Sequence, residues 1–151
     1  MKKLLNISVL LVLILITGCD SSHVDCSSGP VSLAFEFVDQ DSGANLFENG
    51  TFDRTKPVTI TDLNQNKVIQ SIYINSNNLN RLNLLVGFEP GTYNYAIKFE
   101  DKVAFEVSVV TERVKGKHCT NTVLKSKEIK NATYAEDKNT GAFKILINTK
   151  N

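Results

Sequence analysis

The most reactive side chains of this sequence are three cysteines and two histidines, and four of these five residues form two close pairs. His23 lies three residues before Cys26, and His118 directly precedes Cys119. Thiolates and imidazoles are the usual ligands of structural zinc, so the two pairs suggest a metal site. In an extended strand, however, His118 and Cys119 point to opposite faces, which disfavours one shared tetrahedral ion. The sequence therefore leaves three alternatives for Cys26 and Cys119: a disulfide, two unpaired thiols, and, least favoured, a metal site.

The third cysteine, Cys19, follows a segment with the parts of an export signal. Lys2 and Lys3 give it a positive start, residues 4–16 are almost all apolar, and residues 15–19 read Leu-Ile-Thr-Gly-Cys. The apolar stretch is shorter than the roughly 20 residues that a membrane-spanning helix needs. We interpret residues 1–18 as a cleaved signal peptide and not as a transmembrane helix.

Residues 16–19 resemble the lipobox of bacterial lipoproteins, with an aliphatic residue three places before the cysteine, then a small residue and glycine. In that family the cysteine thiol receives a diacylglycerol, the signal is cut before the cysteine, and the new amino group is usually acylated too, with chains such as palmitate. The resemblance implies that Cys19 is the lipidated first residue of the mature protein. It also implies a bacterial envelope lipoprotein, anchored to the inner or outer membrane with its domain outside the cytoplasm. An ordinary secretory signal followed by a chance cysteine is the alternative.

Lipid on Cys19 leaves Cys26 and Cys119 as the remaining thiols, and an exported location permits them to pair. We therefore expect a disulfide between Cys26 and Cys119. It would close a loop of roughly 90 residues, for which the chain-entropy model gives at most about 4 to 5 kcal/mol.

Charge and motifs favour a non-catalytic protein. Removing residues 1–18 takes away two of the 17 basic residues and none of the 16 acids, so the mature net charge is −1. Nucleic acid is therefore not an expected partner. His23 and His118 are the only neutral-pH bases, and the chain has no nucleophile elbow, P-loop or zinc-protease helix. We expect no enzyme activity and no cofactor.

Asp39, Asp41, Gly43 and Asn45 alternate like the start of a calcium loop. The EF-hand pattern fails, because position six from Asp39 is Ala44 and position twelve is Gly50. We predict a polar turn in which Asp side chains cap their own backbone, with cation binding as the lesser alternative.

Apolar and polar residues alternate in most of the mature chain, which is typical of strands with one buried face. No segment of ten or more residues keeps a convincing helical period, although a short helix at 127–135 is possible. Two runs, 92–100 and 103–111, predict a hairpin. The other strands are expected at 31–38, 58–61, 68–75, 82–88, 119–124 and 142–148.

Seven to eight strands without crossover helices predict an all-β fold, a single antiparallel β-sandwich. The Pro90-Gly91-Thr92-Tyr93 segment and the turn at 41–43 resemble immunoglobulin-like and transthyretin-like modules. The whole chain is similar to small uncharacterised Bacteroidota lipoproteins, through its lipobox, its size and residues 38–47. We divide it into a signal peptide (1–18), a flexible tether (19–30) and the sandwich domain (31–151).

The function that these features favour is a membrane-anchored binding or assembly module, whose partner is another envelope protein. The alternative is an envelope lipoprotein that binds a small ligand or ion, or that acts as an inhibitor. A free strand edge would favour the first and an apolar cleft between the sheets the second.

Overall fold

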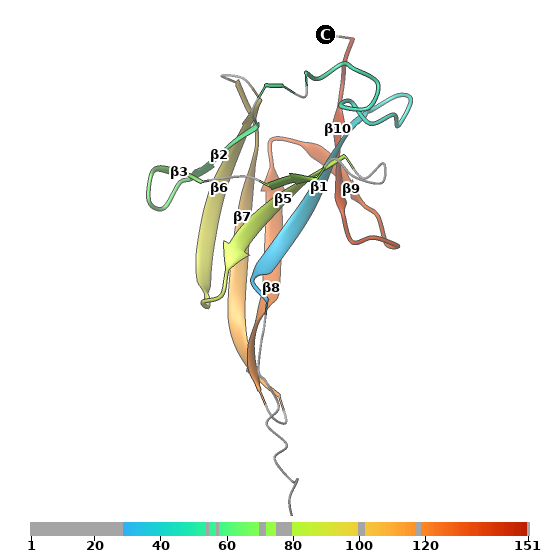
Figure 1. Ribbon diagram of the computed structural model, residues 1–151. Helices are drawn as coiled ribbons and strands as arrows, with labels where there is room; N and C mark the ends of the chain where they lie inside the picture. Colours follow the sequence, from blue (N-terminus) through green and yellow to red (C-terminus); the bar gives the residue numbers. More distant parts are fainter. Residues whose placement is uncertain are drawn as a thin grey trace, which may run out of the picture.

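Two five-stranded sheets pack face to face, as Figure 1 shows for a computed structural model of the chain. The structure describes residues 29–53, 55–56, 58–69, 72–74, 80–99, 102–116 and 119–150. The strands in these ranges are β1 (Val31–Asp39), β2 (Val58–Asp62), β3 (Lys67–Ile69), β4 (Ile72–Ile74), β5 (Arg81–Gly87), β6 (Gly91–Phe99), β7 (Lys102–Lys115), β8 (Thr120–Lys130), β9 (Thr133–Glu136) and β10 (Phe143–Ile147). No helix long and apolar enough to cross a membrane occurs within them. The predicted all-β sandwich is confirmed.

One sheet has the order β4-β5-β1-β10-β9 and the other the order β3-β2-β6-β7-β8. The chain changes sheets four times, between β1 and β2, β3 and β4, β5 and β6, and β8 and β9. All neighbours are antiparallel except β1 and β10, where Phe35 lies beside Phe143 and Asp39 beside Ile147. Among the described strands, this parallel pair is the one departure from the antiparallel arrangement that was predicted.

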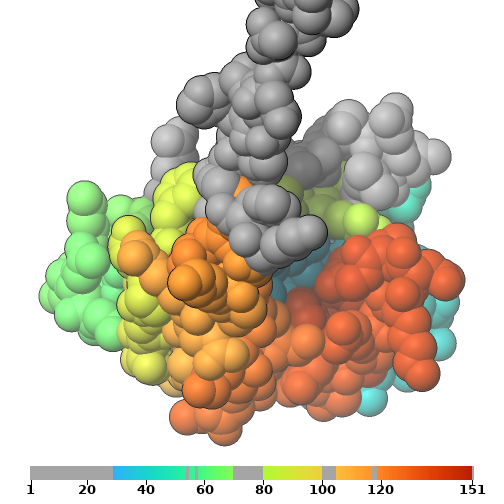
Figure 2. Space-filling view, turned by 90° about the horizontal axis from the view of Figure 1, so that it is seen from below, coloured from blue at the N-terminus to red at the C-terminus, as the bar shows by residue number. Residues whose placement is uncertain are grey.

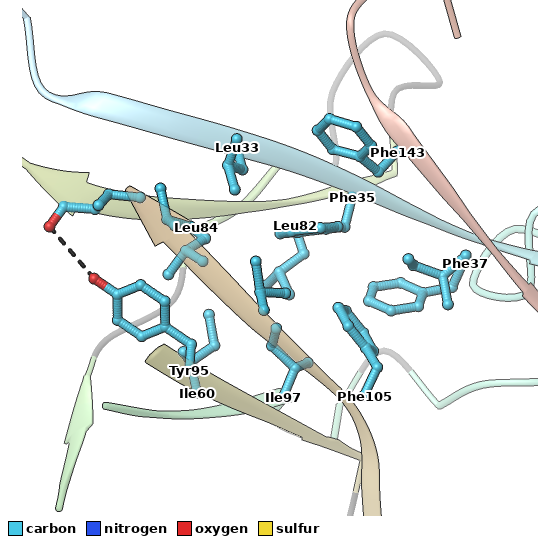
Figure 3. Close-up of a cluster of buried hydrophobic side chains, with 14 of the residues drawn as sticks. Leu33, Phe35, Phe37, Ile60, Leu82, Leu84, Tyr95, Ile97, Phe105 and Phe143 are labelled. Atoms are coloured by element: carbon cyan, nitrogen blue, oxygen red, sulfur yellow. Dashed lines mark hydrogen bonds between the residues drawn. The ribbon is translucent and has the colours of Figure 1, made fainter. Parts of the chain in front are cut away.

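The predicted alternation of β1 is confirmed by its burial. Leu33, Phe35 and Phe37 are buried, and the residues between them are more exposed. They meet side chains of the opposite sheet, such as Ile97 and Phe105, in the core drawn in Figure 3. Burial of large apolar side chains is the main stabilising contribution to a fold of this kind.

Several strand limits differ from those predicted, and the described residues form ten strands where seven or eight were expected. The single strand expected at 68–75 is instead β3 and β4, which belong to different sheets. The possible helix at 127–135 is wrong, because β8 continues to Lys130 and β9 starts at Thr133. The predicted hairpin of β6 and β7 is confirmed, from Gly91 beside Thr111 to Phe99 beside Lys102.

Tyr95, on β6, is buried with its ring in the core, and its hydroxyl donates to the carbonyl oxygen of Val86 at 3.4 Å (Figure 3). Burial, reinforced by the Asp62 carboxylate and by Tyr93, raises the pKa of Tyr95 to about 12. The phenol is therefore neutral at ordinary pH, and its role is to pack in the core.

Candidate functional site

The β7–β8 hairpin extends beyond the rest of its sheet. Gly91, the first residue of β6, pairs with Thr111, so the next four residues of β7 lie past the end of β6. Within the described ranges they pair with the first residues of β8 alone, from Lys115 beside Thr120 to Glu112 beside Val123. We call residues 112–115 and 120–123 the projecting hairpin. Four strand residues span about 14 Å, and Figure 1 shows the hairpin reaching below β5 and β6.

Polar contacts hold the base of the projecting hairpin against the connection between β5 and β6. The buried Thr111 hydroxyl accepts from the Gly91 N–H at 3.0 Å and donates to the Glu89 carbonyl oxygen at 2.9 Å. Arg113 and Glu89 form an exposed ion pair of 2.7 Å. The Thr122 hydroxyl also donates to the Phe88 carbonyl oxygen. The orientation of the hairpin is thus fixed by contacts from both of its strands.

The outer edge of this sheet is β8, which has 11 residues and pairs with β7 on one side. In the described part of the chain no strand pairs with its other side. Edge strands expose backbone donors and acceptors that can pair with a further strand. β8 is therefore the structural candidate for a binding edge.

Lys127 protects one part of this edge. Its side chain points across to the other sheet, where Nζ lies 3.0 Å from the Glu136 carboxylate and 4.2 Å from the centre of the Phe143 ring. A positive charge over an aromatic face is attracted by the ring electrons. Inward-pointing charges of this kind discourage pairing by another strand, so the more accessible part of β8 precedes Lys127.

Of the reactive residues singled out in the sequence, Cys119 alone is described. It lies directly before β8, at the tip of the hairpin, where its carbonyl oxygen accepts from the Gly116 N–H at 2.7 Å. Cys19, His23, Cys26 and His118 lie outside the described residues. No group of three or more metal-ligating side chains occurs among the residues that the structure describes.

The turn after β1 has the Asp-capped structure that its sequence predicts. The Asp39 Oδ1 atom accepts from the N–H groups of Asp41 at 3.2 Å and Ser42 at 2.8 Å, and from the Ser42 hydroxyl at 2.8 Å. Its Oδ2 atom accepts from the Thr149 hydroxyl at 2.5 Å. Both carboxylate oxygens are thus engaged in closing the turn and joining it to the end of the chain.

The same contacts change the acidity of Asp39. The hydrogen bond from Thr149, followed by those from Ser42, lowers the pKa of Asp39 from 3.8 to about 2. A lowered pKa in the folded state stabilises the fold above the unfolded value of 3.8, and this contribution is lost as the pH falls through about 2.

Asp39→Asn is therefore expected to lower the free energy of unfolding at neutral pH. Its stability should also fall less steeply than that of the wild type as the pH drops from 4 to 2, because the group that titrates there is gone. Denaturant unfolding at several pH values measures both effects. Glu48→Gln, in the same loop, is the control. Parallel pH profiles for Asp39→Asn and the wild type would contradict the assignment.

A half-buried ion pair on the outer side of the first sheet was not predicted from the sequence. The Arg81 Nε atom lies 2.6 Å from the Glu36 carboxylate, joining β5 to β1. Neither residue stands in a recognisable motif, and they are 45 positions apart, so no local signal could have paired them. The contact fits a structural role between two neighbouring strands.

Known proteins add nothing to this geometry. No family model, curated protein or solved structure matches the chain. The likeness to immunoglobulin-like or transthyretin-like modules therefore stays a prediction beyond the shared sandwich architecture.

Proposed function

We propose that this protein is a bacterial envelope lipoprotein, held to a membrane by lipid on Cys19, whose domain binds another envelope protein without catalysing a reaction. The observation that carries the binding role is the long edge of β8, which is open on one side in the described part of the chain. The anchor is supported by the resemblance of residues 16–19 to the lipobox.

The proposed mode of binding is the addition of a partner strand to β8. In this mode main-chain hydrogen bonds supply affinity, and alternate side chains of the added strand supply specificity. Residues 120–126 form the available stretch, because Lys127 is engaged with Glu136 and Phe143. A rigid sheet behind the edge lowers the entropy lost on binding, since β8 is already ordered against β7.

A disulfide between Cys26 and Cys119 is part of the proposal. It is supported by the exported location that the signal implies, because thiols outside the cytoplasm can pair. Because Cys119 lies beside the first residue of β8, this bond would tie the tether to the tip of the hairpin.

A photo-reactive amino acid at Ser126, in living cells, tests the binding edge. Ser126 is exposed in the middle of β8, so we expect a discrete adduct with one envelope protein, identified by sequencing the joined peptides. The matched control is the same probe at Ser108, which lies on the neighbouring inner strand β7. Probe at Ser108 should give little adduct, because an added strand contacts the edge and not the face.

Two results would contradict the proposed function, the first its binding by strand addition and the second its need for the anchor. One is an adduct from Ser108 with none from Ser126, which would place the partner on the face of the sheet. The other is an equal yield of adduct from a Cys19→Ser form released from the membrane, since the proposal needs the anchored protein.

A further inference from the structure

Phe88 differs from the other phenylalanines because its side chain is exposed to solvent. The chain has eight, of which seven lie in the core or pack against it. Phe88 is 57% exposed, although an aromatic ring gains much from burial. Val114 and Val123 of the projecting hairpin are also among the large apolar residues left exposed.

These three residues lie at one end of the sandwich. The Phe88 carbonyl oxygen accepts from Thr122, which neighbours Val123, and Thr122 pairs with Arg113, which neighbours Val114. We call Phe88, Val114 and Val123 the apolar end. Seen from this end, the hairpin (orange) lies beside the β5 and β6 segments (yellow) in Figure 2.

The first described strand, β1, also begins at this end. Val31, the first residue of β1, pairs with Gly87, which directly precedes Phe88. Gly29 is ten positions after Cys19, and ten extended residues span at most about 35 Å. A lipid on Cys19 would therefore lie within about 35 Å of this end of the domain.

We propose that the apolar end rests in the interface of the bilayer to which Cys19 is anchored. The inference deepens the proposed function, because it depends on that anchor. Apolar side chains at a membrane surface gain free energy by leaving water for the acyl boundary. Lys115 lies on the same strand end, where a long cationic side chain can reach lipid phosphates. The edge of β8 is then presented just above the membrane surface.

The absence of tryptophan from the chain makes a direct test possible. Phe88→Trp places one fluorescent reporter in the apolar end. The acylated full-length protein is reconstituted in phosphatidylethanolamine and phosphatidylglycerol vesicles, with or without bromine on the acyl chains. We expect the tryptophan at position 88 to lose most of its emission in brominated vesicles and to emit at shorter wavelength than in detergent-free buffer.

The matched control is Phe52→Trp, at the other end of the domain. Phe52 lies 4.8 Å, between ring centres, from Phe99, the last residue of β6, whereas the apolar end lies near the first residue of that strand. Its emission should be the same in both kinds of vesicle. Melting temperatures of the two variants show that each is folded.

Sedimentation of the same samples separates the two possible failures. Protein that sediments with the vesicles but shows no quenching at position 88 would overturn the docked orientation and leave the anchor standing. Equal quenching at positions 88 and 52 would also overturn it. Protein that does not sediment would overturn the anchor and the docking together.

Discussion

Cys19→Ser is expected to move the protein from the membrane fraction to the soluble fraction without lowering its melting temperature. Each buried methylene of an acyl chain contributes about 0.8 kcal/mol of membrane affinity, so the loss of two or more chains removes the anchor. Among the residues that the structure describes, the core begins at Val31, so substitution at position 19 removes none of the core contacts seen there. Fractionation and thermal unfolding measure the two properties.

An uncut signal segment could hold the variant on the membrane by itself. A second form therefore carries Cys19→Ser behind an ordinary secretory signal that replaces residues 1–18. If this second form still sediments with membranes, the proposed lipid anchor is wrong. Mass spectrometry of the wild-type amino terminus provides a direct check, since an unacylated Cys19 would contradict the proposal.

Cys119→Ser is the reciprocal control for Cys19→Ser. It should stay in the membrane fraction and melt at a lower temperature, because the proposed disulfide closes a long loop worth at most about 4 to 5 kcal/mol. An unchanged melting temperature would mean that Cys26 and Cys119 form no structural disulfide.

Phe37→Ala is expected to be the most destabilising of the single substitutions considered, with a loss of about 3 to 5 kcal/mol. Phe37 is fully buried, and its ring centre lies 4.5 Å from that of Phe99 and 5.8 Å from that of Phe47. The cavity left by alanine would therefore loosen both the contact between the sheets and the loop that contains Phe47. Denaturant unfolding of the wild type and the variant measures the loss.

Phe88→Ala is the matched control, because it removes the same atoms from an exposed site. Its free energy of unfolding in solution should change by no more than about 0.5 kcal/mol. Similar losses for Phe37→Ala and Phe88→Ala would show that the core is not organised around Phe37.

The sequence was sufficient to predict the strands whose pattern is strict. Along Val31–Asp39 and Gly91–Phe99 every second residue is apolar over most of the run, and the structure places those side chains in the core. The Asp39 turn could be predicted equally well, since a short acidic side chain before Ser42 and Gly43 can accept hydrogen bonds from the backbone of the turn. These predictions succeed because the interactions that decide them lie within a few residues.

The ends of β8 could not be predicted from the sequence, because its conformation depends on a strand outside the local segment. Residues 125–130 carry three lysines and one glutamate, and most of them are exposed, so they give little apolar alternation. These residues form the second half of β8 because β7 pairs with them, from Val110 beside Ser126 to Glu106 beside Lys130. The pairing partner, and not local composition, determines the conformation here.

By itself, the sequence determined that the domain beginning at Val31 is built of strands, which faces of those strands are buried, and how the turn at Asp39 closes. Only the tertiary structure decided that β1 and β10 run parallel, that β3 and β4 separate into different sheets, and that β7 and β8 project beyond β6. Alternation with period two tells which side of a strand meets the core, but it is the same for every possible neighbour and direction. The neighbour is chosen by long-range packing of both sheets at once, and that choice placed Phe88 beside the projecting hairpin.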